Sequence, residues 1–229
     1  MSYLFRRILS DREYPGIKLI VFDFDGTLAD TRKLFLRIIK KHLVSFEISL
    51  SKNLLKFFGN TPLEQYLELI GIPQKLTRDV YSGIISDFKE ESHKIKPCKG
   101  FIYVKNIEAK KVIVSNNVTS FIEKSLNYLH ANFFDGVYGA DSFKNKVWMI
   151  NKLCKRYKLS KSEVVYVGDK DIDVDVARGV GCYSVIISNK SSWSLRKDVL
   201  KKKPDYLLTD LSKLNEVINE INSEQLNSI

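Results

Sequence analysis

Apolar runs of strand length recur along the chain. The four clearest cover residues 18–23, 111–115, 163–168 and 183–188. Val and Ile follow one another in these runs instead of alternating with polar residues, which is typical of strands buried on both faces of a parallel sheet. Weaker runs at 136–141 and 205–210 predict two further strands.

Helical periodicity fills the stretches between these runs. Apolar residues recur at helical spacing over 119–129, 147–157, 173–180 and 211–221. Alternating strands and helices predict right-handed crossovers and an open sheet. The predicted fold class is therefore α/β, with a doubly wound, Rossmann-like parallel sheet as its core.

The stretch 31–97 interrupts this alternation because it contains no clear strand run. Its apolar residues fall at helical spacing in three groups, at 34–39, 54–58 and 63–70. We predict a small all-helical domain over 31–97, inserted after the first strand. The core α/β domain then consists of residues 1–30 and 98–229.

Composition agrees with this organisation and excludes several classes of protein. The 229 residues correspond to about one and a half ordinary domains. With 44% hydrophobic and 28% charged residues, a collagen-like or largely disordered chain is excluded. No run approaches the ~20 apolar residues of a membrane helix, and the N-terminus lacks a secretory apolar segment. Three widely spaced cysteines indicate reduced thiols, so we expect a cytoplasmic monomer or homodimer.

The net charge of +10 has two interpretations. It is typical either of a protein that binds nucleic acid or a membrane, or of a lysine-rich solvated surface. No nucleic-acid-binding motif accompanies the lysine clusters, and acidic residues stand close to most of them. We therefore favour the solvated surface, whose positive field would also attract a small anionic substrate.

Side chains that bind ions follow three of the strong runs. Asp23 and Asp25 come after the first, Ser115 after the second, and Asp169 and Asp173 after the third. Ligands of open α/β sheets bind beyond the carboxyl ends of the strands, so we expect these groups to meet at one edge. Four carboxylates gathered there repel one another unless a cation binds. Mg²⁺ suits such oxygen ligands and also accepts substrate phosphate oxygens.

The segment Asp23-Phe24-Asp25-Gly26-Thr27-Leu28 resembles the first motif of the haloacid dehalogenase-like hydrolase superfamily, in its phosphatase form. Ser115, Lys146 and residues 168–173 resemble the second, third and fourth motifs, in the same order along the chain. The resemblance spans residues 19–181, and it is to the phosphoglycolate phosphatases among the members of this superfamily. It implies that the helical insert is a cap that closes over the core site, excludes water and selects the leaving group.

Chemistry through an aspartyl-phosphate follows from this resemblance. Asp23 would be the nucleophile, and Asp25 would first protonate the leaving group and then activate water. Their i, i+2 spacing puts both side chains on the same side of an extended segment. Gly26 would let the chain turn sharply. The resemblance also places Gly26 and Thr27 at the substrate phosphate, with turn formation as an equally weighted role for Thr27.

The resemblance also implies a set of metal-binding residues. They are the Asp23 carboxylate, the Asp25 main-chain carbonyl, Asp169 and Asp173. Asp173 is expected to act through water or by orienting another ligand. Asp171 and Asp175 do not match the family's spacing, and we interpret them as surface residues.

Phosphate binding is assigned to the loop after the second strand and to a lysine. The Ser115 hydroxyl and the Asn116 amide would bind the phosphoryl oxygens as charge develops on them. Lys146 is favoured over Lys144 because it begins the helical pattern of 147–157, although the proline that often follows this lysine is absent. The lysine would offset repulsion between phosphate and carboxylates.

These features lead to the hypothesis of a Mg²⁺-dependent phosphatase acting on a small phosphorylated metabolite, similar to phosphoglycolate phosphatases. One alternative is a phosphosugar mutase of the β-phosphoglucomutase kind, which shares both aspartates and the cap. Another is a non-catalytic nucleic-acid-binding module, against which the intact Asp23 and Asp25 pair argues. A dehalogenase is disfavoured because Asp25 stands where that branch lacks the acid/base carboxylate.

Overall fold

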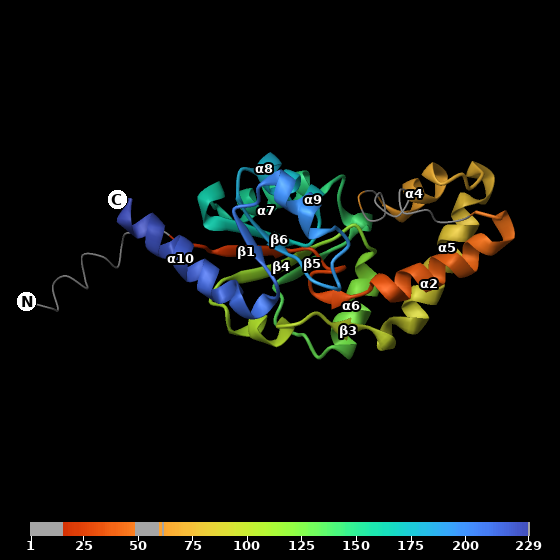
Figure 1. Cartoon of the computed structure of the whole chain (residues 1–229), viewed down its shortest axis with the longest axis horizontal. Helices are drawn as coiled ribbons and strands as arrows, with labels where there is room; N and C mark the ends of the chain where they lie inside the picture. The colour runs from red at the N-terminus through yellow and green to blue at the C-terminus, as the bar shows by residue number, and fades with distance from the viewer. Residues whose placement is uncertain (1–15, 49–59, 61, 229) are drawn as a thin grey trace, which may run out of the picture.

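A six-stranded parallel sheet forms the centre of the protein (Figure 1). We describe it from a computed structural model, in which residues 16–48, 60 and 62–228 are described. The strand order is β5-β4-β1-β6-β7-β8. In chain order the strands are β1 (Leu19–Phe22), β4 (Lys110–Val114), β5 (Gly136–Tyr138), β6 (Val164–Gly168), β7 (Tyr183–Ile187) and β8 (Tyr206–Leu208).

All six strands predicted from the apolar runs are present, and the α/β fold class is confirmed. The two weak runs became β5 and β8, which are the edge strands and have three residues each. Their residues are half-buried, whereas every residue of β1 and β6 is buried. An edge strand therefore needs fewer apolar residues, which explains why its sequence signal is weaker.

The register of the three central strands aligns the segments that follow them. Phe22 of β1 lies opposite Ile113 of β4 and Val167 of β6. The next backbone amide, that of Asp23, donates a hydrogen bond of 2.8 Å to the carbonyl of Val167. Because the strands are parallel, the residues that follow all three leave the sheet at the same edge.

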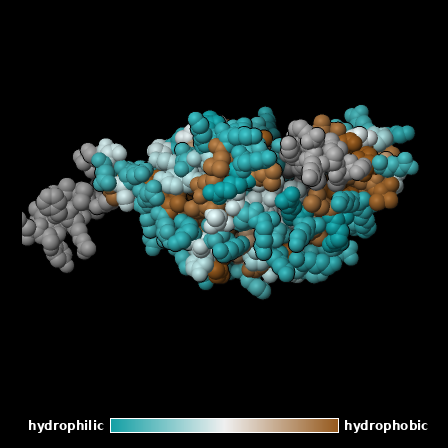
Figure 2. Space-filling view, viewed as in Figure 1, coloured by the Kyte–Doolittle hydropathy of each residue, from teal (hydrophilic) through white to brown (hydrophobic). Residues whose placement is uncertain are grey.

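Helices cover both faces of the sheet. Alternate residues of β1 point into two different clusters of buried apolar side chains, with Ile20 and Phe22 in one and Leu19 and Val21 in the other. The first cluster includes α6 (Thr119–Tyr128) and α10 (Leu214–Asn227), and the second includes α7 (Lys146–Tyr157) and α8 (Asp171–Val180). Hydrophilic residues cover most of the face of the core seen in Figure 2.

The helices of the insert lie beyond one end of the sheet in Figure 1. They are α2 (Arg32–Leu43), α4 (Leu63–Leu69) and α5 (Gln74–Glu91), and they follow β2 (Ala29–Asp30) and precede β3 (Lys96–Pro97). β2 and β3 pair antiparallel, so the chain enters and leaves this helical segment side by side. The expected helix at 54–58 lies outside the described residues, and the division into domains stays a prediction.

The packing of α2 against α5 explains why this segment is helical. The rings of Phe35 and Phe88 lie 4.0 Å apart between the two helices, and both side chains are buried. On the outer side, Arg37 pairs with Glu91 and Lys41 pairs with Asp87. The polar residues of α2 thus face solvent while its apolar stripe supports the interface.

Shorter helical elements connect the main ones. The sequence pattern did not indicate α9 (Arg196–Lys202), because this helix buries only Val199 and so has no apolar stripe. The predicted helix of 211–221 begins at Leu214, after a 3₁₀ turn. The 3₁₀ helices are Val44–Phe46, Ser92–Lys94, Phe101–Asn106, Ala140–Ser142, Lys161–Glu163 and Leu211–Lys213.

Two further expectations concern membranes and cysteines. Within the described part of the chain, no helix combines the length and the apolar character that crossing a membrane requires. Cys98, Cys154 and Cys182 are all buried and unbridged, as the prediction of reduced thiols requires.

The turn at Gly100 generates a stability prediction. Gly100 has a φ of +83°, and a Cβ there would overlap the backbone of Leu211 and Ser212. Gly71 has a φ of +100°, but a Cβ there would meet nothing within 4 Å. We expect Gly71→Ala to lower the free energy of unfolding by about 1–2 kcal/mol through its backbone conformation alone. Gly100→Ala should cost a further ~1–3 kcal/mol because the clash adds to this strain.

Urea unfolding of the two variants and the wild type measures this difference. Equal losses for Gly71→Ala and Gly100→Ala would contradict the close approach between residue 100 and the turn at 211–212.

Candidate active site

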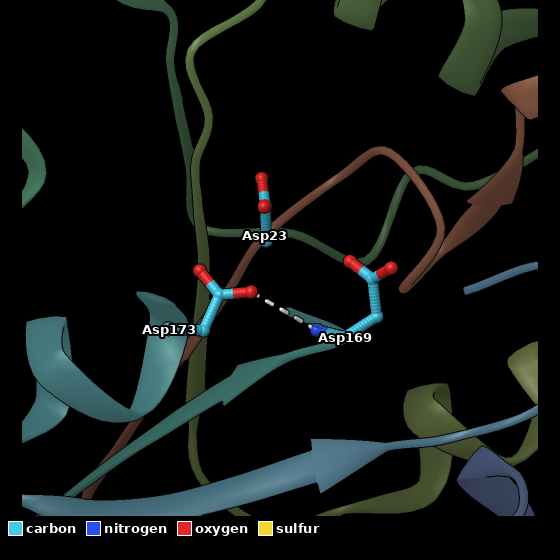
Figure 3. Close-up of side chains that lie close together, drawn as sticks. All are labelled: Asp23, Asp169 and Asp173. Carbon is cyan, nitrogen blue, oxygen red and sulfur yellow. Dashed lines mark hydrogen bonds between the residues drawn. The ribbon is translucent and has the colours of Figure 1, made fainter. Parts of the chain in front are cut away.

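Three buried aspartates converge at the carboxyl edge of the sheet (Figure 3). Asp23 follows β1, Asp169 follows β6, and Asp173 lies in the first turn of α8. One carboxylate oxygen from each lies within 4.8 Å of the others. The fold thus brings together three of the residues that were expected to form the metal site.

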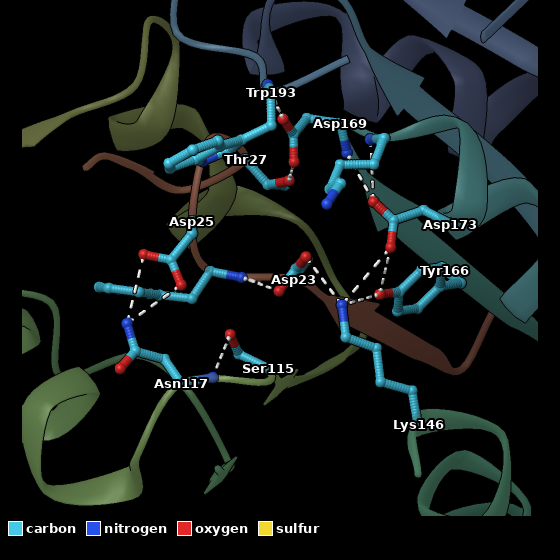
Figure 4. A network of polar contacts seen from close by, with 12 residues as sticks. Asp23, Asp25, Thr27, Ser115, Asn117, Lys146, Tyr166, Asp169, Asp173 and Trp193 are labelled. Atoms are coloured by element: carbon cyan, nitrogen blue, oxygen red, sulfur yellow. Dashed lines mark hydrogen bonds and ion pairs between the residues drawn. The ribbon is translucent and has the colours of Figure 1, made fainter. Parts of the chain in front are cut away.

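Lys146 provides a buried cation beside this cluster (Figure 4). It is the first residue of α7 and is 6% exposed. Its Nζ lies 2.8 Å from Asp23 Oδ2 and 3.4 Å from Asp173 Oδ1. Lys144 stands two residues before the helix and is exposed. Of the two lysines considered, the structure therefore places Lys146 in the site.

Tyr166 joins Lys146 to Asp173 and was not anticipated. Its hydroxyl accepts a 2.8 Å hydrogen bond from Lys146 Nζ and donates a 3.0 Å hydrogen bond to Asp173 Oδ1. In the sequence Tyr166 stands inside an apolar strand, so its pattern indicated only a core residue. Its position on the strand, three residues before Asp169, is the one feature of the sequence that could have indicated that Tyr166 belongs to the site.

The second carboxylate oxygen of Asp173 holds the backbone that carries Asp169. Asp173 Oδ2 accepts hydrogen bonds from the amides of Asp169 and Lys170, at 3.0 and 2.9 Å. Since both of its oxygens are engaged, the geometry favours an orienting role for Asp173. Its expected action at a metal, through water or by orienting another ligand, stays a prediction.

Asp169 is oriented by two donors from other parts of the chain. The Thr27 hydroxyl donates to its Oδ1 at 3.3 Å, and the amide of Trp193 donates to its Oδ2 at 2.5 Å. Gly26, with a φ of +78°, passes so close that a Cβ would lie 2.5 Å from Asp169 Oδ2. Only glycine fits this approach. The contact supports an orienting role for Thr27, and phosphate binding by Gly26 and Thr27 stays a prediction.

Asp25 is held by an amide that the sequence analysis did not assign. Asn117 Nδ2 donates to Asp25 Oδ2 at 3.1 Å and lies 3.4 Å from Oδ1. Asn117 is in the same loop as Ser115 and Asn116, so its nearness to the sheet edge was visible in the sequence. The direction of its side chain was not.

The two aspartates that follow β1 have different electrostatic surroundings. Burial raises the pKa of Asp23, against the attraction of Lys146. Burial, together with the negative charge of Asp23, raises the pKa of Asp25 to about 7. Burial opposes the charged form of Lys146, but the neighbouring Asp23 and Asp173 outweigh it and raise the lysine's pKa. A permanent cation therefore stands beside Asp23, while Asp25 is poised to carry a proton near neutral pH.

Lys170 is a second buried basic residue of the site. Burial lowers the pKa of Lys170, against the attraction of Asp169. Burial also raises the pKa of Asp169 well above its usual range, and Asp173 and Asp23 add to this effect. Four carboxyl groups and two ammonium groups thus share one buried edge, and the carboxyl oxygens are hard ligands. Such a donor set fits a divalent cation such as Mg²⁺.

A cavity of about 220 Å³ opens over these groups. Its floor is formed by groups at the sheet edge, namely Asp23, Asp25, Ser115, Asn116, Asn117 and Lys170. Its walls come largely from the helical segment and from the loops that face it. Ser115 and Asn116 therefore lie where phosphate oxygens would reach Asp23, and their role as phosphate ligands stays a prediction.

Asp171 and Asp175 lie outside the cluster, as their spacing suggested, although both are half-buried. Asp171 Oδ1 accepts a 2.7 Å hydrogen bond from Ser194 Oγ, and Asp175 pairs with Lys202 at 2.6 Å. Asp171 joins the start of α8 to the segment before α9, and Asp175 joins the middle of α8 to α9. Both carboxylates therefore have structural roles.

Known proteins resemble this chain over most of its length. Residues 20–187 match the sequence profile of the haloacid dehalogenase-like hydrolases. A phosphoglycolate phosphatase from Vibrio cholerae is 25% identical, over 89% of this chain and 97% of its own length. The pyrophosphatase PpaX of Halalkalibacterium halodurans is 22% identical, over 88% and 97%. A haloacid dehalogenase-like family hydrolase from Streptococcus pneumoniae has a similar structure, with a TM-score of 0.72, 19% identity and coverage of 88% and 98%.

The buried Lys146–Asp23 pair generates a second stability prediction. Lys146→Met leaves Asp23 and Asp173 without their cation, and breaking a buried pair in this way should cost about 3–5 kcal/mol of unfolding free energy. Lys144→Met changes an exposed lysine of the same segment and should stay within about 0.5 kcal/mol of wild type. Chemical denaturation of both variants without added metal checks this. Similar losses for the two lysines would show that Lys146 is not paired in the buried cluster.

The carboxylate cluster generates a third prediction, about cation binding. Mg²⁺ at ten times its dissociation constant should stabilise the wild type by about 1.4 kcal/mol, which raises its melting temperature by about 3–5 °C. Asp169→Asn removes one of the mutually repelling carboxylates. This variant should melt higher than wild type in EDTA and should gain nothing from Mg²⁺.

Thermal unfolding with EDTA and with Mg²⁺ measures both effects. Asp175→Asn is the control, because Asp175 lies on the same helix as Asp173 but outside the cluster. A full Mg²⁺ shift retained in Asp169→Asn would show that the cation does not bind at these aspartates.

Proposed function

Since the chain belongs to the haloacid dehalogenase-like hydrolase family, we propose that it is a phosphatase that hydrolyses a small phosphomonoester through an aspartyl-phosphate on Asp23. One observation carries the proposal: two aspartates of different character line the floor of one cavity. Asp23 is paired with the buried ammonium of Lys146 at 2.8 Å, and Asp25 is held by the amide of Asn117 at 3.1 Å. Hydrolysis through a covalent intermediate needs these two states, an ionised nucleophile and a proton donor.

In the first step, a carboxylate oxygen of Asp23 attacks the phosphorus and the bond to the leaving-group oxygen breaks. Asp25 gives its proton to that oxygen, so the product leaves as a neutral alcohol. The raised pKa of Asp25 favours the protonated form that this step requires. Asn117 keeps the Asp25 carboxyl directed into the cavity.

In the second step, water attacks the phosphorus of the aspartyl-phosphate. Asp25, now ionised, takes a proton from this water, and the bond between phosphorus and Asp23 breaks. Inorganic phosphate leaves and both aspartates return to their starting states. The Ser115 hydroxyl and the Asn116 amide contact the phosphoryl oxygens in both steps, and Lys146 balances their negative charge.

Mg²⁺ is the cofactor we propose, because the donors at the site are carboxyl and carbonyl oxygens. The residues that would hold it are Asp23, Asp169 and the main-chain carbonyl of Asp25, with Asp173 orienting the loop that carries Asp169. When bound, the cation neutralises phosphate and carboxylate charge. Thr27 and the amide of Trp193 fix the position of the Asp169 carboxylate.

We further propose that residues 31–97 act as a cap on the core, in a cytoplasmic enzyme. The paired segments β2 and β3 form the connection on which the helices would move. Phe35, Tyr81 and Ile85 from these helices line the same cavity as Asp23. Closure would therefore exclude water from the phosphorus until the leaving group departs.

The nucleophile assignment yields the fourth prediction. Asp23→Asn preserves the shape of the side chain but removes its nucleophilic charge, so kcat/KM for phosphomonoester hydrolysis should fall at least about 10³-fold. Asp175→Asn is the matched control and should keep wild-type activity. The measurement is release of inorganic phosphate from a panel of phosphomonoesters with Mg²⁺, with sugar phosphates also followed by product analysis.

Two results would overturn the proposal. Equal activity in wild type and Asp23→Asn would exclude Asp23 as the nucleophile. An isomeric sugar phosphate formed in place of inorganic phosphate would reassign the chain as a mutase.

A further inference from the structure

The cavity differs in chemistry between its floor, which includes Asp23, and its walls. Its walls are mainly apolar and aromatic, and they come from the helical segment, the loop after β4 and the segment before α9. The side chains concerned are Phe35, Leu63, Tyr81, Ile85, Val118 and Trp193. A leaving group that binds here would therefore exchange water for apolar contacts, which favours a ring or a branched hydrocarbon over a small polar fragment.

Two carboxylates interrupt these apolar walls. Glu64 comes from the first turn of α4, and Asp141 comes from the 3₁₀ turn after β5. Burial raises the pKa of Tyr81, and the negative charges of Glu64 and Asp141 raise it further. Both carboxylates therefore influence the same tyrosine. The amide and the hydroxyl of Thr119 both donate to Asp141 Oδ1 at 2.8 Å, which fixes this carboxylate.

The balance of charge differs between the two parts of the cavity. Among the described residues that line it, the basic side chain is Lys170, next to Asp169 at the phosphate end. The carboxylates on the walls of the cavity are Glu64 and Asp141. A leaving group with its own carboxylate, such as that of phosphoglycolate, would meet two like charges there. A leaving group with an ammonium would meet two opposite charges and the faces of aromatic rings.

Building on the phosphatase function proposed above, we propose that the substrate is a phosphomonoester whose leaving group combines an aromatic or branched apolar body with a cationic amine. The phosphate lies at Asp23, the apolar body lies against the walls contributed by Phe35, Tyr81 and Trp193, and the amine lies between Glu64 and Asp141. Phosphoglycolate is then a poor substrate, although relatives of this chain carry that name.

A matched pair of aryl phosphates tests the proposal. 4-(Aminomethyl)phenyl phosphate and 4-carboxyphenyl phosphate share the ring and the phosphate and differ in the charge at the far end. Phenyl phosphate serves as the neutral reference. With the wild-type enzyme and Mg²⁺, kcat/KM for the amine should exceed that for the carboxylate at least tenfold. The ratio should shrink with added salt, because the cavity is open to solvent.

Variants of the two carboxylates test whether Glu64 and Asp141 cause the preference for the amine over the carboxylate. Glu64→Gln and Asp141→Asn should each reduce the amine-to-carboxylate ratio about threefold, which is the size of effect expected for one partly solvated charge. The Asn side chain can still accept the hydrogen bonds from Thr119. Glu68→Gln removes an exposed charge one turn further along α4 and should leave the ratio at the wild-type value.

The outcomes separate this inference from the function on which it rests. A ratio at or below one, or a ratio that neither Glu64→Gln nor Asp141→Asn lowers, would overturn the proposed substrate class while leaving the phosphatase function intact. If none of the three phosphates is hydrolysed, and no other phosphomonoester is, the phosphatase function itself fails.

Discussion

Burial of several carboxyl groups at one edge of a parallel sheet is the constraint on which this structure depends. Asp23, Asp169 and Asp173 are held within 4.8 Å of one another away from water, where like charges repel strongly. The ion pair between Lys146 and Asp23 offsets part of that repulsion inside the protein. Because Lys146 begins α7, the start of this helix has to lie against the end of β1, and the packing of one face of the sheet follows from that requirement.

The other polar residues of the site divide into those that orient carboxylates and those that line the cavity. Thr27, Asn117 and Tyr166 each hold one aspartate in a fixed direction. Ser115 and Asn116 instead line the cavity, where a phosphate would lie. This division explains how an acidic site can bind an anion. Under the proposed function, the aspartates would hold a cation, and separate donors would face the substrate. The net charge of +10 is a sum over the whole sequence. It does not describe the charge of the site, where four carboxyl groups and two ammonium groups lie together.

Relatives that match most of this chain in sequence bear names that refer to different substrates, phosphoglycolate in one case and pyrophosphate in another. The geometry offers a physical reason for such variation. Most of the groups proposed to act on the phosphate come from strand ends, whose positions the sheet register fixes. Groups that would contact the leaving group come from the helical segment and from loops, and here they include Glu64, Tyr81 and Asp141. These can change without disturbing the sheet.

The sequence by itself determined the strands, most helices and the aspartates of the site, because apolar periodicity and the residues directly after a strand are local properties. It favoured Lys146 over Lys144 without excluding Lys144, since the choice depends on which lysine the start of α7 turns into the core. The positions of Tyr166 and Asn117 near strand ends were visible in the sequence, but their hydrogen-bond partners were not, because these depend on the direction of each side chain in the folded protein. Only the tertiary structure brought Glu64, Tyr81 and Asp141 to the lining of one cavity. Side chains from separate elements acquire common chemistry only when packing brings them to one cavity.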